Sequence, residues 1–257
     1  MTARTPLADK TVVVTRPVAQ AQNLLSSLGQ YPVKIIQFPT IEIRAVENAE
    51  PATDLFRSLA EYDTVIFNSV NAVHHAMRLI QSLSTTFGKQ RIAALGPATR
   101  AALEQYGLLT DVVPKTGFRS EDLLDHEGLQ GQNILIVRGV GGREYLVQRL
   151  RERGARVDIA EVYLRLSPAT RPTVDLCTYS VKNSVVLIHS ADSAHNLWAL
   201  CTRDEQRWIA TVALIAGSQR IADTATAIGF VKSPIIAKDA SDAAMLDALL
   251  TWAQTSG

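Results

Sequence analysis

Short apolar runs alternate along the chain with stretches of helical period. The runs are nearly continuous in hydrophobicity, which is typical of parallel strands covered by helices on both faces. They predict strands at residues 11–15, 33–38, 64–67, 91–95, 133–137, 184–188, 211–215 and 234–237. Between them, apolar residues spaced three and four apart predict amphipathic helices, among them residues 21–28, 194–201 and 245–252. The alternation predicts an α/β fold with doubly wound parallel sheets.

The pattern occurs twice, about 120 residues apart. Several motifs share nearly one offset: residues 11–17 with 133–139, 65–69 with 186–190, 93–96 with 214–217, and 120–122 with 241–243. A period of this length is too long for a solenoid unit and fits a whole domain. The sequence therefore predicts two similar lobes, and two lobes imply a cleft between them.

Two extended segments beside prolines, residues 36–44 and 158–166, favour connectors between the lobes over interior strands. If both are connectors, the middle of the chain forms one lobe and the two chain ends together form the other. A plain division near residue 130 would satisfy the repeat equally well. The periodicity alone leaves both divisions open.

Composition narrows the class of protein. The 257 residues are 47% hydrophobic, which is enough to bury two ordinary cores. The 26 Lys and Arg residues nearly balance the 25 Asp and Glu residues, so we expect no nucleic-acid partner. We find no apolar run typical of a signal peptide or a membrane span, and expect a cytoplasmic protein without a membrane partner. Cys177 and Cys201 alone cannot form a disulfide framework.

Ligands of open α/β sheets bind where strands end and helices begin. Helix N-termini at that edge present backbone N–H groups and a partial positive charge, which suit carboxylates or phosphates. The repeated motifs fall at this edge, and we expect the following residues to bind substrate: Arg16, Ser69, Asn71, Thr99, Arg138, Gly139, Gly141, Arg143, Ser190 and Ser218. Arginines and helix starts together favour an acidic ligand between the lobes.

Structural explanations compete with these assignments. A serine between a strand and a helix is most often an N-cap, which applies to Ser69, Ser190 and Ser218. The glycine-rich residues 139–142 lack the full order of a dinucleotide loop and the Lys-Ser/Thr ending of a phosphate loop, so they support nucleotide binding only weakly. An arginine at a strand end can equally be a surface charge.

Other chemistries have less support. Possible metal ligands are Cys177, His189, His195 and Cys201. Their spacing matches no compact zinc pattern, so we expect no metal. The chain has no G-x-S-x-G motif to supply a hydrolase nucleophile. His74 and His75 lie in a helical stretch and are expected to be partly solvated.

Tyr163 differs from its counterpart in the repeat, Ile41. A tyrosine on a connector beside a cleft can donate a proton or a hydrogen bond to a leaving group. A half-buried aromatic that fills a joint would explain the residue equally well. Tyr163 is nevertheless the residue that we expect to be catalytic.

These motifs resemble the uroporphyrinogen-III synthase family over nearly the whole chain. The resemblance rests on residues 15–17, 67–73, 96–99, 138–144 with 154–155, and 162–163, in this order and at this spacing. It implies two α/β lobes joined by a two-stranded connector, with both chain ends in one lobe. The implied lobes are residues 1–37 with 167–257, and residues 42–160, with connector strands at residues 36–44 and 158–166.

The resemblance implies a reaction without a cofactor. Hydroxymethylbilane, a linear tetrapyrrole with eight carboxylates, would lose water, invert ring D through a spiro intermediate and close to uroporphyrinogen III, in haem biosynthesis. Tyr163 matches the family's tyrosine proposed to help hydroxide leave, and Thr99, Ser190 and Ser218 fall at or near other cleft positions. The chain departs from the family at Asn68, where threonine is common, and at the equivalent His189.

The main hypothesis is therefore a cyclising, dehydrating synthase whose only partner is its small-molecule substrate. We expect a monomer, which could receive the substrate from the preceding enzyme of the pathway. A non-catalytic two-lobed module that binds an acidic small molecule is the alternative, because two α/β lobes around a cleft serve that purpose equally well. A transferase that uses a nucleotide or sugar phosphate rests on the glycine-rich stretch alone.

Overall fold

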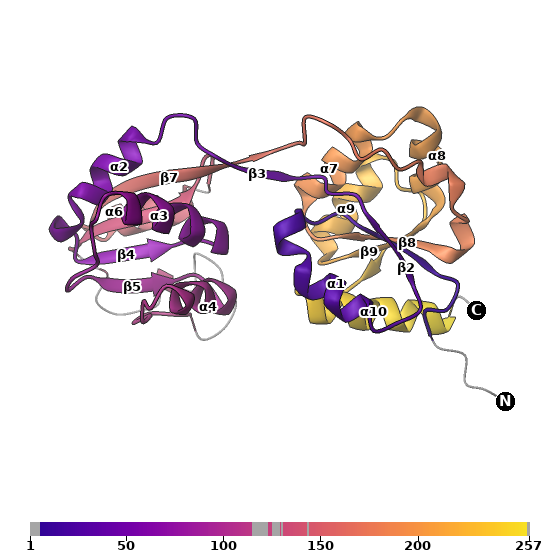
Figure 1. Ribbon diagram of the computed structural model, residues 1–257, viewed down its shortest axis with the longest axis horizontal. Helices are drawn as coiled ribbons and strands as arrows, with labels where there is room; N and C mark the ends of the chain where they lie inside the picture. The colour runs from indigo at the N-terminus through magenta and orange to yellow at the C-terminus, as the bar shows by residue number, and fades with distance from the viewer. Residues whose placement is uncertain (1–5, 115–122, 125–128, 130, 143, 256–257) are drawn as a thin grey trace. The chain divides into compact units, whose positions relative to one another are not determined.

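The structure is a computed structural model that describes residues 6–114, 123–124, 129, 131–142 and 144–255. The chain divides into two compact units (Figure 1). Unit 1 contains residues 1–42 and 166–257, and unit 2 contains residues 43–165. The chain therefore passes between the units twice, and both chain ends belong to unit 1.

Unit 1 is built on a five-stranded sheet in the order β10-β9-β8-β1-β2, and each neighbouring pair is parallel. Its strands are β1 (Thr11–Val14), β2 (Lys34–Gln37), β8 (Ser184–Ile188), β9 (Ala213–Ala216) and β10 (Ile235–Ile236). Its helices are α1 (Gln22–Leu28), α7 (Ala191–Leu200), α8 (Arg203–Thr211), α9 (Gln219–Ile228) and α10 (Asp242–Thr255), with short 3-10 turns η1 (Val18–Gln20), η3 (Leu176–Thr178) and η4 (Val181–Asn183).

Helices cover both faces of this sheet because its central strands are apolar at nearly every position. Val13 and Val186 pack into the cluster formed with α7, α8 and α9. Their neighbours Val12 and Val185 point the other way, into the cluster formed with α1 and α10. All four side chains are fully buried. Alternation along a strand thus divides one apolar run between two cores.

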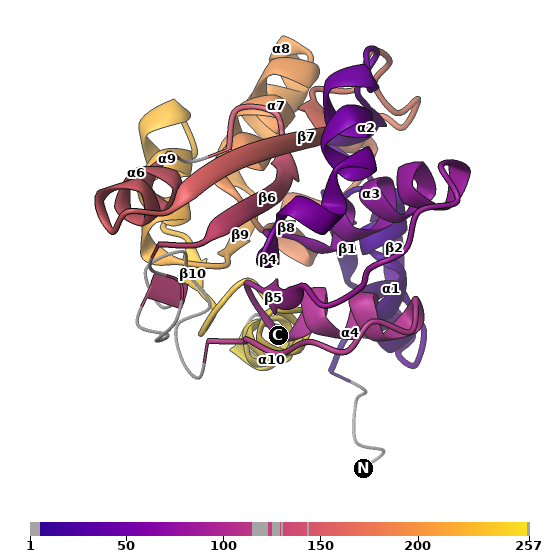
Figure 2. The ribbon, with the colours of Figure 1, turned by 90° about the vertical axis from the view of Figure 1, so that its left-hand side faces the viewer.

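Unit 2 contains a second five-stranded sheet, in the order β3-β7-β6-β4-β5, of which Figure 2 labels β7, β6, β4 and β5. Its strands are β3 (Glu42–Ala45), β4 (Thr64–Phe67), β5 (Arg91–Ala94), β6 (Asn133–Gly139) and β7 (Arg156–Leu166). Its helices are α2 (Glu50–Arg57), α3 (Val70–Ser82), α4 (Pro97–Gln105) and α6 (Tyr145–Glu152), with the 3-10 turn η2 (Leu59–Glu61). The pairs β4–β5, β4–β6 and β6–β7 are parallel.

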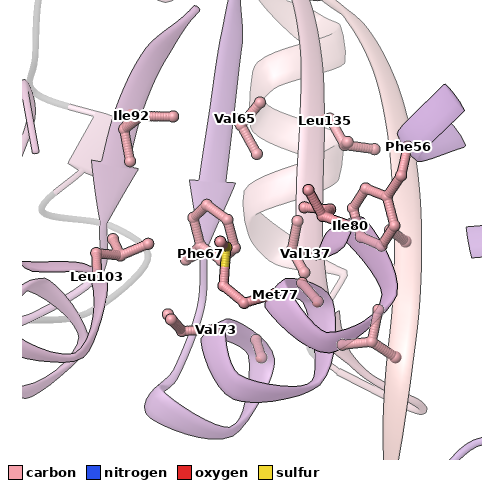
Figure 3. Close-up of a cluster of buried hydrophobic side chains, with 14 of the residues drawn as sticks. Phe56, Val65, Phe67, Val73, Met77, Ile80, Ile92, Leu103, Leu135 and Val137 are labelled. Atoms are coloured by element: carbon pink, nitrogen blue, oxygen red, sulfur yellow. The ribbon is translucent and has the colours of Figure 1, made fainter. Parts of the chain in front are cut away.

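The larger core of unit 2 lies between this sheet and helices α2, α3 and α4. Figure 3 shows Phe67 of β4 and Val137 of β6 beside Met77 of α3. The opposite face packs against α6 through residues such as Ile66 and Leu146. Both faces of the central strands β4 and β6 are therefore buried.

The predicted α/β class with parallel sheets is confirmed. Each apolar run expected to be a strand is one, within a few residues. Residues 158–163, which the sequence assigns to a connector, belong to β7, which pairs with β6 as far as Tyr163 and lies between β3 and β6. The prolines that suggested a connector, Pro168 and Pro172, follow the strand and interrupt none of its hydrogen bonds.

An ion pair between the partly exposed Arg171 and the buried Glu205 stabilises the segment that enters unit 1 after β7. Both carboxylate oxygens of Glu205, a side chain 2% exposed, accept hydrogen bonds from Arg171 at 2.6 Å. The same carboxylate accepts from the backbone N–H and hydroxyl of Thr202, each at 2.9 Å. Burial alone would raise the pKa of Glu205, but the hydrogen bonds from Arg171, Thr202 and the Leu176 N–H lower it to about 2.

We expect Glu205→Gln to destabilise the protein at pH 7 by roughly 3 kcal/mol, since a lowered pKa means that folding favours the charged form. This contribution is present above the ordinary carboxyl pKa of 4.5 and is lost as the pH falls toward 2. Urea unfolding of both proteins from pH 7 to pH 2.5 should therefore show the stability difference shrinking on acidification. Glu152→Gln is the control, because its pair with Arg149 is exposed and should contribute little. A difference independent of pH would contradict the role of the charge.

Candidate functional site

Polar side chains gather at the edge of each sheet where the parallel strands end. In unit 2, Ser69 follows β4 and caps α3, accepting a hydrogen bond from the Ala72 N–H at 3.1 Å. Gly96 follows β5 and is the N-cap of α4. The two helices begin at the same edge because β4 and β5 are parallel. Their first turns leave backbone N–H groups without helical partners, which suits an anion.

Tyr163 is part of this edge. Its side chain is buried, and its hydroxyl lies 3.1 Å from the Oγ atom of Ser69, so that either oxygen can donate the hydrogen bond. Its ring stacks on the imidazole of His75, with centroids 5.8 Å apart and an interplanar angle of 26°. The phenol is therefore fixed at its hydroxyl and on one ring face.

A bulge brings the tyrosine ring over Gly139. The register of β6 and β7 shifts between Arg138 and Gly139, so that Arg138 is opposite Glu161 and Gly139 is opposite Tyr163. A β-carbon on Gly139 would lie 2.6 Å from the Cζ atom of Tyr163, which is closer than two non-bonded carbon atoms can approach. Gly139, which we expected to bind substrate, thus has a structural reason to be glycine: it makes room for the ring.

Arg138 interacts with the protein itself. The guanidinium donates to Glu144 at 2.6 Å, to Glu161 at 3.1 Å and to the Gly142 carbonyl at 3.1 Å, and its side chain is 7% exposed. Arg138 also lines a pocket of about 510 Å³ within unit 2, together with Val140 and Glu161. These contacts hold the glycine-rich stretch in place, a role that the sequence did not suggest for Arg138.

The other expected residues of unit 2 lie at helix starts or in the glycine-rich stretch. Asn71 and Thr99 are in the first turns of α3 and α4, and Thr99 is buried. Gly141 has a φ angle of +72°, a conformation that favours glycine. Arg143 lies outside the described residues. Unit 2 therefore brings Ser69, Gly139 and Tyr163 into one cluster, with Asn71 and Thr99 at the same edge.

Unit 1 has a corresponding edge. Ser190 caps α7 by accepting from the Ser193 N–H at 3.1 Å, and Ser218 caps α9 by accepting from the Ile221 N–H at 3.4 Å. Both serines have the capping role that was the structural alternative in the sequence. Arg16 follows β1 and forms an ion pair with Asp242 at the start of α10. Its side chain remains 24% exposed, more than that of Arg138.

A buried hydroxyl network ties the strand ends of unit 1 together. The Thr15 hydroxyl donates to the Leu187 carbonyl at 2.6 Å and accepts from the Ser193 hydroxyl at 2.9 Å. The Thr40 hydroxyl lies 2.7 Å from the Ser193 hydroxyl. Sequence reasoning missed Thr40 and Ser193. In the sequence, the only indication of this network is a hydroxyl residue, Thr15, at the end of an apolar strand.

Two residues at these edges carry polar atoms that the protein does not satisfy. Asn68 lies between β4 and Ser69, and its buried Oδ1 atom has no hydrogen-bond partner among the described residues. His189 lies between β8 and Ser190, and neither of its buried ring nitrogens has a partner among those residues. Burial, assisted by the positive charge of Arg16, lowers the pKa of His189 to about 3. The imidazole is therefore neutral at physiological pH.

Metal-binding groups and membrane-spanning helices are not found in the described part of the chain. It contains no group of three or more His, Cys, Asp and Glu side chains that could hold a metal ion. Within the same residues, no helix is long and apolar enough to cross a membrane. His74 and His75 are partly buried, and burial together with the nearby Arg78 lowers the pKa of both. The groups described at the two edges are hydroxyl, amide, imidazole, guanidinium and carboxylate groups.

Fold and edges together define a class of α/β protein with two parallel-sheet units, each of which presents capped helix starts beside its strand ends. The model of the family described as "Uroporphyrinogen-III synthase HemD" matches residues 21–247. The chain belongs to this family. The resemblance found in the sequence is confirmed.

Several relatives carry the name uroporphyrinogen-III synthase. Those of Salmonella typhimurium and Escherichia coli are 28% and 27% identical over 244 residues, which is 93% of this chain and 99% of each relative. That of Synechococcus elongatus is 29% identical over 175 residues, 66% of each chain.

Solved structures share the fold. A mutant uroporphyrinogen III synthase from the extremely thermophilic bacterium Thermus thermophilus superimposes with a TM-score of 0.60 at 16% identity, covering 96% of this chain and 100% of that one. The enzyme from Helicobacter pylori 26695 gives a TM-score of 0.58 at 17% identity, covering 95% and 99%. At this identity the likeness concerns the fold alone.

We expect Gly139→Ala to displace the Tyr163 ring, because the added methyl group overlaps it while Ser69 and His75 hold its other sides. The overlap should destabilise the protein by about 1–3 kcal/mol. Urea unfolding and the near-UV circular dichroism of the tyrosines measure both effects. Gly88→Ala is the matched control in the same unit, since its β-carbon meets nothing closer than 3.6 Å. Equal behaviour of the two variants would contradict the close packing.

Proposed function

We propose that the chain is a uroporphyrinogen-III synthase, which converts hydroxymethylbilane to uroporphyrinogen III with loss of water and inversion of ring D through a spiro intermediate. The family match over residues 21–247 supports this proposal. So does the hydrogen bond between Tyr163 and Ser69 at a sheet edge, because it holds a phenolic hydroxyl where a ligand of this fold would bind. This contact is the single observation on which the chemistry rests.

Tyr163 assists the departure of the substrate's hydroxyl group. Loss of water breaks a carbon–oxygen bond, and the leaving oxygen needs a proton or a strong hydrogen bond as negative charge develops on it. The phenol supplies its O–H, while Ser69 and the stacked His75 keep the oxygen in one position. The carbon left behind is then attacked by the ring carbon that forms the spiro intermediate.

The carboxylates of the substrate bind to helix starts and to Arg16. The capping serines Ser69, Ser190 and Ser218 each satisfy one backbone N–H, and further N–H groups in each first turn remain for an anion. Arg16 is the more exposed of the two strand-end arginines, which suits contact with a carboxylate. Arg138 acts indirectly, by holding the glycine-rich stretch that contains Gly141.

Orientation of the flexible tetrapyrrole supplies much of the acceleration. Well-held reactants can gain about 7–11 kcal/mol from orientation alone. The expected arrangement of two lobes, with connector strands and a cleft that holds the substrate, belongs to this proposal. So do a monomeric state and handover of the substrate from the preceding enzyme of the pathway. No cofactor takes part in the proposed reaction.

Incubation with hydroxymethylbilane followed by chromatographic separation of the isomers tests the proposed function. We expect the type III isomer, because unassisted closure gives type I. Product that is all type I would show a binding module rather than the proposed enzyme.

Tyr163→Phe should reduce kcat by about 10²-fold while product affinity changes little, because it removes a donor needed chiefly in the transition state. Turnover and product binding are measured on the same preparation. Tyr62→Phe is the control, since it removes a buried tyrosine hydroxyl of the same unit that donates to Asp158 at 3.0 Å, away from Tyr163. Equal losses of turnover and product binding in Tyr163→Phe would contradict a role in leaving-group departure.

A further inference from the structure

Buried polar atoms without partners are rare in folded proteins, and each needs an explanation. Among the described residues, such side-chain atoms occur in Asn68, Thr110, Ser184 and His189. Asn68 and His189 lie at the carboxyl ends of β4 and β8, whereas Ser184 is the first residue of β8, at the opposite edge of its sheet. Asn68 and His189 therefore lie at the edge where ligands of this fold bind, whereas Ser184 does not.

The same kind of orphan occurs at one place in both copies of the repeat. Residues 65–69 correspond to residues 186–190, so Asn68 and His189 occupy equivalent positions. Each follows the last residue of a buried central strand and precedes a serine that caps the next helix. Asn68 and His189 are different residue types, but both have a buried polar atom without a partner among the described residues at the equivalent position. One explanation for both is therefore preferable to two separate ones. A partner outside the protein chain fits both positions, and a ligand that displaces water is one such partner.

The orphaned atoms also define the chemistry of the missing partner. The Oδ1 atom of Asn68 is an acceptor only. Burial and the charge of Arg16 lower the pKa of His189 to about 3, so its imidazole is neutral and has one bare nitrogen acceptor and one N–H donor. Both residues therefore offer a neutral acceptor. The partner that both acceptors need is a neutral N–H donor, which a carboxylate cannot supply; a carboxylate would satisfy only the remaining N–H of His189.

We propose that Asn68 and His189 are substrate-binding residues, each of which accepts a hydrogen bond from a pyrrole N–H of the linear tetrapyrrole. This inference rests on the proposed function, which supplies the pyrrole groups. Both side chains are half-buried as a whole, so rotation about the side-chain bonds can turn the buried atoms toward a ligand. Binding then pairs these atoms with N–H groups of the substrate.

If Asn68 and His189 bind substrate, replacing either one should raise the stability of the substrate-free protein and weaken substrate binding. Replacing an orphaned polar group by an apolar group of similar shape removes a desolvation cost, so the substrate-free protein becomes more stable. The same replacement removes a contact to the substrate, so binding becomes weaker. A group that stabilises the fold would instead lower stability when it is removed.

The experiment compares His189→Phe and Asn68→Leu with the wild-type protein. For both variants we expect Tm without substrate to rise by about 2–4 °C. We expect KM for hydroxymethylbilane to rise about three- to tenfold, the cost of one neutral hydrogen bond, with kcat within about twofold of wild type. Asn68→Leu and His189→Phe alter different units, so the proposal remains testable if one of them fails to fold.

Ser184→Ala is the matched control. Its hydroxyl is also buried without a partner among the described residues, and it belongs to the strand that His189 follows. Tm should rise as in the other variants, while KM should stay at the wild-type value. His189→Asn places at position 189 the residue found at position 68 and restores an acceptor, so its KM should lie closer to wild type than that of His189→Phe.

An unchanged KM in both His189→Phe and Asn68→Leu would overturn the proposal, as would a fall in Tm in both. A rise in KM of the same size in Ser184→Ala would overturn it too, since the effect would then not depend on the sheet edge. If the proposed function is wrong, the wild-type protein itself forms no uroporphyrinogen III. That result would overturn this inference as well.

Discussion

Burial of the central strands on both faces decides where polar chemistry can occur in this protein. Strands β1, β4, β6 and β8 send alternate side chains into two different apolar cores, so none of their interior positions can hold a solvated polar group. Parallel pairing then places their carboxyl ends at one edge of each sheet. The hydroxyls, amides and charges of the candidate site therefore gather at or beside the carboxyl ends of these strands. Ser69, Arg16 and Ser190 follow their strands, whereas Tyr163 lies within β7, opposite the last residue of β6.

Much of this arrangement could be predicted from the sequence because it depends on local pattern. Continuous apolar runs indicated the strands, and the repeat indicated equivalent edge positions in the two halves. The sequence alone predicts that Ser190 and Ser218 are N-caps, because a serine between a strand and a helix commonly accepts a hydrogen bond from the first turn of the helix. The substrate-binding role assigned to these residues stays a prediction. The same holds for the lobe boundaries inferred from the family resemblance.

The remaining features depend on contacts between residues far apart in the sequence. The proximity of Ser69 and Tyr163 spans 94 residues and depends on the register shift at Gly139, which no local pattern encodes. The sequence predicts that His75 lies in a helix and is partly solvated, but it does not predict that the ring stacks on Tyr163. Arg138 looked like a ligand contact because it ends a strand. Its two glutamate partners, which lie 6 and 23 residues further along the chain, could not be paired with it from spacing alone.

The two edges differ in how they use charge. In unit 2 the strand-end Arg138 pairs with Glu144 and Glu161. The Tyr163 hydroxyl lies beside Ser69, and the Tyr163 ring stacks on His75, whose pKa is lowered by burial and by nearby positive charges. In unit 1 the strand-end Arg16 has Asp242 as its ion-pair partner and remains partly exposed. A carboxylate-rich substrate would accordingly be attracted more strongly to the edge of unit 1. The edge of unit 2 instead holds a phenol in a fixed position, and loss of the hydroxyl group requires a positioned donor more than a further positive charge.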